Sequence, residues 1–166
     1  MRVRLGGTRR THTRPAPALR LPAAYDVLDV PAAAGHRVLL QLERLGTPLG
    51  PVLGVQPGGP GHEGGGSRLR FLVEAGTTAS FLADLKELGW DPADTDVRTI
   101  GVVLAAETPL PAAGSPRWVR PPETERMVVL PPARLLLGAL AYACRHTEGR
   151  PGFARSKTGR PPLWAS

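Results

Sequence analysis

The chain of 166 residues contains a single cysteine, Cys144, so it can form neither an internal disulfide nor a zinc site built from several cysteines. It has no uninterrupted apolar run of the roughly 18 to 20 residues that cross a membrane, and no apolar segment with a cleavage site follows its basic N-terminus. These absences predict a protein of the reducing cytoplasm that has no membrane partner. The length suffices for one domain with a buried core.

Acidic residues are missing from one end of the chain and nearly absent from the other. Residues 1–20 hold six arginines and no acid, and residues 145–166 hold five basic residues against Glu148. The formal net charge of +7 therefore comes from the two ends, and residues 21–144 are mildly acidic. Arginine-rich ends of this kind bind DNA or RNA phosphates in a salt-dependent way. The alternative is that both ends are solvated and have no partner.

Hydrophobic periodicity is confined to the middle of the chain. Residues 1–22 combine arginine, proline and small residues without a period, and residues 147–166 are again basic. Such composition predicts a disordered basic arm and a disordered basic tail. The folded domain is accordingly expected to span residues 23–146.

Within this domain the apolar pattern predicts strands that alternate with helices. The strands are 25–30, 51–56, 68–74 and one that opens at Asp96; the helices are 32–45, one capped by Thr77 or Thr78 and ended by Gly89, and a buried one over 133–146. A long glycine-rich loop joins the second and third strands as a hairpin. This order predicts an α+β fold with a single mixed or antiparallel sheet and flanking helices.

The first strand carries two carboxylates within the run A-Y-D-V-L-D-V-P. Side chains two apart on a strand share a face, and side chains three apart do not. Asp26 and Asp29 are therefore predicted to point in opposite directions. The residue that would share a cation with Asp29 stands two positions further on, and it is Pro31.

No complete catalytic or phosphate-binding motif is present. The glycine-rich loop lacks the Lys-Ser/Thr ending and the following helix of a P-loop, so a flexible hairpin connection is the favoured interpretation. The four histidines have no metal-site spacing, and Ser67 and Ser115 have no accompanying nucleophile-base pattern. The residues by themselves therefore do not indicate a hydrolase or a histidine-based metal centre.

Several short stretches occur in an order and spacing found in a known family. They are Y-D-V-L-D-V-P-A-A-A-G with L-E-R-L-G-T-P-L-G-P-V, then G-G-G-S-R-L-R-F-L-V, L-G-W-D-P-A-D-T-D-V-R, P-R-W-V-R-P-P and P-P-A-R-L-L-L-G-A-L-A-Y-A. With these stretches, residues 18–146 resemble the N-terminal domain of bifunctional DNA primase/polymerases of the archaeo-eukaryotic primase type, in the divergent form found in actinobacteria. Complete members begin with a further strand and helix that residues 1–17 do not resemble. The domain is therefore expected to be abbreviated at its N-terminus or to start upstream.

The resemblance implies a nucleotidyltransferase site in which acids hold two divalent ions and a histidine contacts the incoming triphosphate. Asp29 matches the first acid and Asp96 the last, but Pro31 stands at the second acid and Arg68 at the histidine. Asp29 and Asp96 would then hold a single Mg²⁺ or Mn²⁺ ion. Arg68, with Ser67 beside it, would contact nucleotide phosphates.

Because two of the four motif positions are lost, the resemblance implies a degenerate DNA primase/polymerase-like domain that is catalytically inactive and keeps weak nucleotide or nucleic-acid binding. Two alternatives stay open. One is a weakly active metal-dependent nucleotidyltransferase that uses Asp29 and Asp96. The other is a structural or regulatory domain that binds a protein partner.

Overall fold

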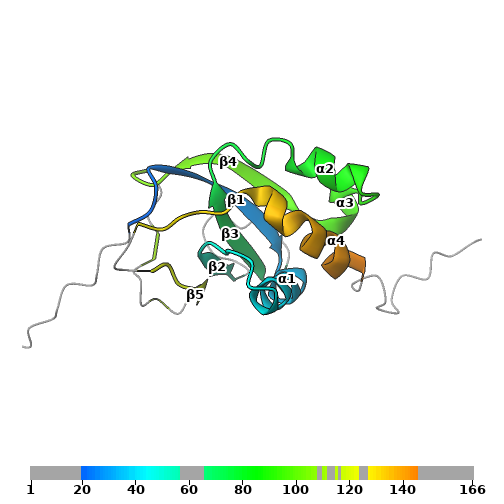
Figure 1. The fold of residues 1–166 in the computed structure, drawn as a ribbon, viewed down its shortest axis with the longest axis horizontal. Coiled ribbons are helices and arrows are strands. Elements are labelled where there is room, and N and C mark those ends of the chain that lie inside the picture. The colour runs from blue at the N-terminus through cyan, green and yellow to red at the C-terminus, as the bar shows by residue number, and fades with distance from the viewer. Residues whose placement is uncertain are drawn as a thin grey trace, which may run out of the picture.

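A five-stranded antiparallel sheet with helices packed on it forms the part of the chain that the computed structural model describes (Figure 1). That part comprises residues 20–56, 66–107, 110–111, 115, 117–123 and 127–145. The strand order is β4-β1-β3-β2-β5. This architecture confirms the predicted α+β fold with a single sheet. The predicted basic tail, most of the glycine-rich loop and residues 1–19 of the predicted arm lie outside the described residues.

The helices and strands follow the chain order expected from the sequence, with short additions. The strands are β1 (Ala24–Pro31), β2 (Val52–Val55), β3 (Arg68–Glu74), β4 (Arg98–Leu104) and β5 (Trp118–Arg120). The helices are α1 (Ala32–Arg44), α2 (Phe81–Glu87), α3 (Pro92–Thr95), the 3-10 helix η1 (Ala133–Leu136) and α4 (Leu137–Arg145). Neither α3 nor β5 was predicted, because elements of three or four residues are too short to show a hydrophobic period. Among the described residues, no helix is long and apolar enough to cross a membrane.

β1 is an interior strand of the sheet, between β4 and β3, and it is apolar on both faces. It pairs antiparallel with β3 and with β4, and its six middle residues are buried. Leu28 and Val30 pack toward the helices, whereas Tyr25 and Val27 pack on the opposite face. A nearly continuous apolar run is what a strand covered on both faces requires, so the sequence prediction for this strand is confirmed.

The main hydrophobic core lies between the sheet and a layer made of α1, α2, η1 and α4 (Figure 1). α1 contributes Val38, Leu39 and Leu42, which share one side of the helix. A side-chain carbon added at Gly35 would lie 2.9 Å from Leu69 on β3. The glycine therefore allows α1 to approach the sheet closely.

The opposite face of the sheet is covered over part of its length by a second hydrophobic cluster. This cluster contains Tyr25, Val27, Leu53, Leu72, Trp118, Val128 and Leu130, with Leu21 packed against it. Leu21 belongs to the stretch predicted as a disordered arm, so the fold takes in residues before position 23. Further along, the same face carries charged residues from three neighbouring strands.

The threonines expected to cap the second helix have other partners. α2 begins at Phe81, and the hydroxyls of Thr77 and Thr78 donate to the carbonyl oxygen of Glu74 and to the carboxylate of Asp26, respectively. The prediction of a threonine cap is therefore wrong. Both hydroxyls are used to tie the loop after β3 to the sheet.

Two further predictions need correction. Asp96 ends α3 in a left-handed backbone conformation, with φ of 48°, and the strand begins only at Arg98. Aspartate tolerates this conformation better than most residues. The C-terminal helix begins with the 3-10 turn η1 and is not buried all round, since Tyr142 is 55 % exposed.

Asp26 is a buried carboxylate that holds an irregularity in the sheet. It is 1 % exposed and accepts hydrogen bonds from the backbone and hydroxyl of Thr78 and from the backbone N–H of Val102. At this point one residue of β1 lies opposite two residues of β4, which is the pattern of a β-bulge. Val102 has a φ of 22°, which β-branched residues rarely adopt. The carboxylate therefore helps to hold a strained backbone in place.

Burial alone would raise the pKa of Asp26, but hydrogen bonds from Thr78, Gly76 and Val102 outweigh it and hold the pKa below its ordinary value. A carboxyl group whose pKa is lowered by folding contributes stability above its unfolded pKa of about 3.9. This contribution is lost as the pH falls through the folded pKa. Asp26 is therefore expected to make the fold sensitive to acid.

Replacing Asp26 by Asn should lower the free energy of unfolding by about 1–3 kcal/mol at neutral pH, because an amide nitrogen cannot accept a bond from Thr78 or Val102. The difference from the unmodified protein should shrink below about pH 4, where protonation removes the same advantage. Urea unfolding at neutral and acidic pH measures both effects. Asp94→Asn, at an exposed position of α3, is the matched control and should change stability little. Equal losses in the two variants would contradict this role of Asp26.

Candidate functional site

Five charged side chains gather on the sheet face that lacks helices. Asp29 lies on β1, Arg68 and Arg70 lie on β3, and Arg98 begins β4, with Asp96 two residues before it. The strand register places Arg70 and Arg98 directly beside Asp29, one on each side. Arg68 lies on the same face because alternate residues of a strand share a face. Ordinary strand pairing therefore assembles the cluster.

The Arg68 guanidinium bridges the two aspartates. Its Nε donates to Oδ1 of Asp29, and its Nη1 donates to Oδ2 of Asp96 at 2.5 Å. Its Nη2 donates to the backbone carbonyl oxygens of both residues, at 3.0 Å for Asp29 and 2.7 Å for Asp96. All three guanidinium nitrogens are thus engaged, and their planar arrangement links β1 to the start of β4.

Two further arginines complete the cluster. Nε of Arg70 donates to Oδ2 of Asp29 at 2.9 Å, and Nη2 of Arg98 lies 2.9 Å from Oδ1 of Asp96. Each carboxylate therefore binds two arginines, and Arg68 is common to both. The three arginines exceed the two aspartates, so the cluster as a whole is positively charged.

The cluster is buried at its centre and exposed at its rim. The side chains of Arg68 and Asp29 are 4 % and 7 % exposed, whereas those of Arg98 and Asp96 are 56 % and 48 % exposed. Burial alone would lower the pKa of Arg68, but its bonds and charges with both aspartates raise that pKa above its ordinary value. Burial alone would raise the pKa of Asp96, but Arg68 and Arg98 hold it below its ordinary value. Both groups are therefore charged at neutral pH.

Asp29, Asp96 and Arg68, which the sequence singled out, meet in this cluster, whereas Ser67 lies beside it. Ser67 is exposed, and its hydroxyl donates to the side-chain oxygen of Gln56 at 3.2 Å. Arg68 is turned inward and is committed to the two carboxylates. A phosphate could reach it only after those ion pairs had opened.

Pro31 and Asp26, the other residues of β1 that the sequence analysis considered, lie on the faces that strand alternation predicts. Pro31 pairs with Arg68 across β1 and β3, so the position at which the resemblance expects a second acid lies beside Arg68 in the sheet. Asp26 points to the opposite face, as expected, where its partners lie in the helix-side loop and the bulge. Sequence reasoning did not include Arg70 and Arg98 in the site. Arg70 stands two residues from Arg68 on one strand, and this strand period is the signal that finds it. Arg98 is placed by its pairing with Asp29 across β1 and β4, which leaves no local signal.

The place where the two aspartates converge does not fit a divalent metal ion in this arrangement. The Arg68 guanidinium lies between the carboxylates and takes one oxygen of each. In the part of the chain that the structure describes, no three histidine, cysteine, aspartate or glutamate side chains come together. Mg²⁺ and Mn²⁺ need carboxylate oxygens that are free to bind them, so the ion pairs with Arg68 would have to open first.

The chain matches no protein-family model, no curated protein sequence and no solved structure. The features that bear on function are therefore the buried ion pairs, the exposed Arg98 at the rim and the pairing of Pro31 with Arg68.

Replacing Arg68 by Met should lower the free energy of unfolding by about 3 kcal/mol or more, because it leaves the buried Asp29 carboxylate short of a charged partner. Arg98→Met should cost less than about 1 kcal/mol, since the ion pair of Arg98 with Asp96 is exposed to solvent. Denaturant unfolding of the two variants at neutral pH measures the contrast.

The double variant Arg68→Met with Asp29→Leu tests whether the loss comes from an unpaired charge. It should recover part of the stability lost in Arg68→Met, because an apolar pair has no charge to desolvate. Similar losses for Arg68→Met and Arg98→Met would show that burial does not set the strength of these ion pairs.

Proposed function

We propose that this chain is a primase/polymerase-like domain that no longer carries out metal-dependent nucleotidyl transfer and instead binds the phosphates of nucleotides or nucleic acids. The observation that carries the proposal is the position of the Arg68 guanidinium. It binds both of the carboxylates to which the sequence resemblance assigns the metal. The two carboxylates come from β1 and from the residues just before its neighbour β4, so they converge on a single cation.

A fixed guanidinium replaces the charge of a metal ion but not its chemistry. It neutralises Asp29 and Asp96, yet it offers no coordination position for a primer hydroxyl or a pyrophosphate oxygen, which two-metal catalysis requires. Moving it away would leave the buried Asp29 carboxylate with Arg70 as its remaining charged partner. The second acid position is also occupied by Pro31. These features favour binding over catalysis.

The arginines at the rim supply the capacity to bind anions. The side chain of Arg98 is 56 % exposed and that of Arg70 is 24 % exposed. Both are held by aspartates, which orient the guanidinium groups before any ligand arrives. Paired N–H donors of this kind suit phosphate oxygens. The phosphate contact that the sequence assigned to Arg68 is therefore proposed for Arg70 and Arg98.

Removing the guanidinium should create a metal site. The variant Arg68→Ser with Pro31→Asp frees the oxygen that Arg68 holds on each carboxylate and adds a third carboxylate beside position 68. We expect Mn²⁺ to raise the melting temperature of this variant and to leave that of the unmodified protein unchanged, because a ligand that binds only the folded state stabilises it. Thermal unfolding with and without Mn²⁺ measures the difference.

Asp29→Ala in the same variant background is the control and should abolish the Mn²⁺ effect. An equally large effect of Mn²⁺ on the unmodified protein would mean that Arg68 does not block the site. Primer extension provides an independent check. Robust extension by the unmodified protein, abolished by Asp29→Ala, would replace this proposal with the weakly active nucleotidyltransferase.

Arg98→Gln should weaken the binding of a single-stranded DNA oligonucleotide about three- to tenfold at low salt, because it removes a charge-assisted contact to phosphate. Arg37→Gln removes the same charge from an exposed position of α1, on the other side of the sheet, and should change the affinity much less. Fluorescence anisotropy of a labelled oligonucleotide at low and high salt measures both.

Equal effects of Arg98→Gln and Arg37→Gln would assign the binding to the basic ends of the chain and remove the sheet face from the proposal. No binding at low salt by the unmodified protein would contradict phosphate binding altogether. That result would favour the structural or regulatory domain.

A further inference from the structure

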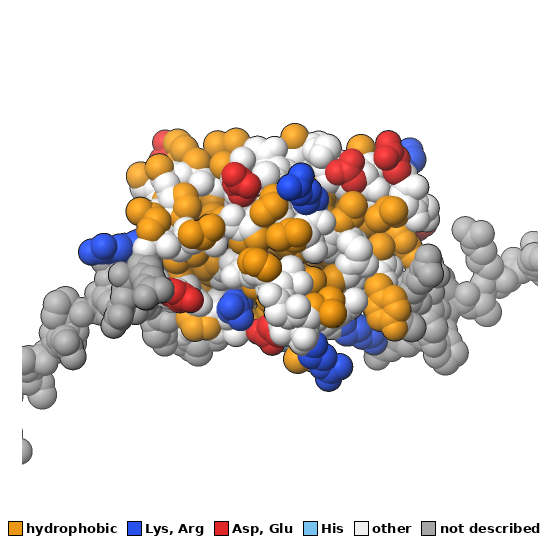
Figure 2. Space-filling model, viewed as in Figure 1, with side chains coloured by type: hydrophobic (Ala, Val, Ile, Leu, Met, Phe, Trp, Pro, Cys, Tyr) orange, Lys and Arg blue, Asp and Glu red, His pale blue; other side chains and the backbone are white. Residues whose placement is uncertain are grey.

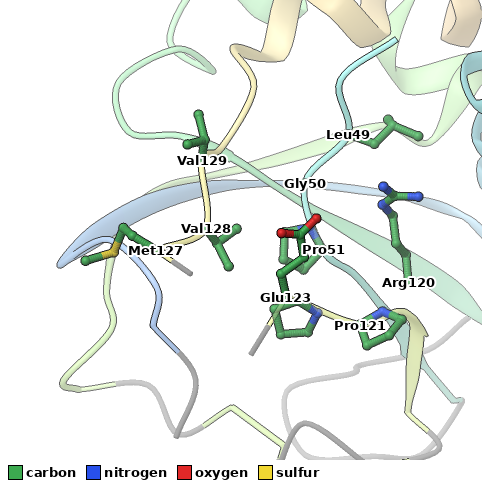
Figure 3. Close-up of a pocket in the computed structure, with 10 residues that line it drawn as sticks. Leu49, Gly50, Pro51, Arg120, Pro121, Glu123, Met127, Val128 and Val129 are labelled. Atoms are coloured by element: carbon green, nitrogen blue, oxygen red, sulfur yellow. The ribbon is translucent and has the colours of Figure 1, made fainter. Parts of the chain in front are cut away.

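A cavity of about 320 Å³ opens beside β2 and β5 and shares no lining residue with the arginine cluster (Figure 3). Three segments that are distant in the sequence form it, namely 49–51, 120–123 and 127–129. Apolar side chains line it from Leu49, Pro51, Pro121, Pro122, Met127 and Val129, together with the charged side chains of Arg120 and Glu123.

Two of the lining side chains are unusually exposed for apolar residues. Val129 is 87 % exposed and Met127 is 62 % exposed. Figure 2 shows hydrophobic side chains gathered over the middle of this face, where the segment that leads into α4 crosses the sheet in Figure 1. Apolar side chains grouped at a hollow mark a contact surface. An apolar segment that covers the hollow would remove this surface from water.

The polar groups of the cavity favour a basic neighbour. Arg120 is paired with Glu43 at 3.2 Å. Glu123 adds a carboxylate among the apolar lining residues (Figure 3). A segment that is mostly apolar and carries an arginine therefore matches the lining in both respects.

We propose that residues 14–19, R-P-A-P-A-L, lie across this cavity as a strap. The described chain begins at Arg20, whose backbone carbonyl accepts a hydrogen bond from the N–H of Val128, a lining residue, at 2.9 Å. Leu21 packs against the hydrophobic cluster that contains Val128 and Leu130. The residues that precede Arg20 are thus attached at the edge of the cavity.

Leu19 is the largest apolar residue of the strap, and it directly precedes the anchored Arg20. Val129 directly follows Val128, whose N–H makes the anchoring hydrogen bond. Leu19 and Val129 therefore each stand one residue from the bonded pair, which brings them within reach of each other. A contact between them would cover an apolar side chain that is otherwise open to water.

The length and composition of residues 14–19 fit this place. Six extended residues span about 20 Å, which is enough to cross a hollow of this size. Pro15 and Pro17 restrict the backbone before it binds and carry no N–H that would lose its water. Ordering such a segment therefore costs less than ordering a flexible one. Arg14 supplies a basic group for the carboxylate of the lining.

The basic tail is a poorer occupant than this segment. Residues 146–166 continue from α4, whose C-terminal end lies across the molecule from β5 (Figure 1). The effective concentration of a tethered group falls as the tether that must be spanned becomes longer. The short tether of residues 14–19 therefore favours them for the cavity.

The coupling between Leu19→Asp and Val129→Asp tests the strap in the full chain. If the strap covers Val129, each charge alone should lower the folding equilibrium constant at least threefold. The double variant should lose little more than the larger single loss, because both charges disrupt the same contact. If no segment covered Val129, Val129→Asp alone would change the free energy of unfolding little. Urea unfolding of the three variants and the unmodified protein measures the coupling.

Leu5→Asp is the matched control for Leu19→Asp, because it places the same charge outside the strap, and its effect should be additive with that of Val129→Asp. Additive effects for Leu19→Asp and Val129→Asp would overturn the proposal. Coupling of Val129→Asp with Trp164→Asp would assign the cavity to the tail, and coupling that depends on protein concentration would assign it to a second copy. Either result would also overturn the strap.

A labelling experiment tests the same contact without relying on stability. In a Cys144→Ser background, Leu19→Cys should react with a soluble thiol reagent at least threefold more slowly than Leu5→Cys, because the contact with Val129 shields it. Adding Val129→Asp should remove the difference. Equal reaction rates at the two positions, or a difference that survives Val129→Asp, would overturn the proposal.

Discussion

The ion pairs of Arg68 connect three neighbouring strands of the sheet, β3, β1 and β4. The guanidinium extends from β3 and binds the side chains and backbone carbonyls of Asp29 on β1 and of Asp96 just before β4. Because Arg68 and Asp29 are nearly buried, loss of either one would leave the other short of a charged partner in a place that water hardly reaches. The same contacts occupy the carboxylate oxygens that a metal ion would need. One interaction therefore underlies both the stability of the sheet and the proposed loss of catalysis.

β1 carries a second buried aspartate on its other face, and this one has different partners. Asp26 is held by the uncharged donors of Thr78 and Val102, whereas Asp29 is held by arginines. Uncharged donors stabilise a carboxylate without neutralising it, and here they fix a bulge and the loop that leads to α2. The two aspartates of β1 therefore have different roles, and only Asp29 belongs to the site of the proposed function.

Elements with a clear hydrophobic period could be predicted from the sequence. β1, α1 and the β2-β3 hairpin lie where they were expected, because strand and helix periods are local properties of the chain. The features that could not be predicted share a physical cause. Thr78 bonds an aspartate 52 residues away, and β5 is a three-residue strand that forms only by pairing with β2. Partners so distant in sequence leave no local pattern.

The sequence by itself determined which side chains of β1 share a face, the α+β class of the domain, and the identity of Asp29, Arg68 and Asp96 as residues of interest. The shared face follows from the two-residue period of a strand and the class from the order of the elements, whereas Asp29, Arg68 and Asp96 were singled out by the sequence resemblance. Only the tertiary structure decided that Arg68 lies between the two aspartates and that Arg70 and Arg98 flank them. These contacts span 28 to 41 residues of sequence for the pairs made by Arg68 and Arg70. They depend on how β1 registers against β3 and β4, and that register is set by the packing of the whole sheet.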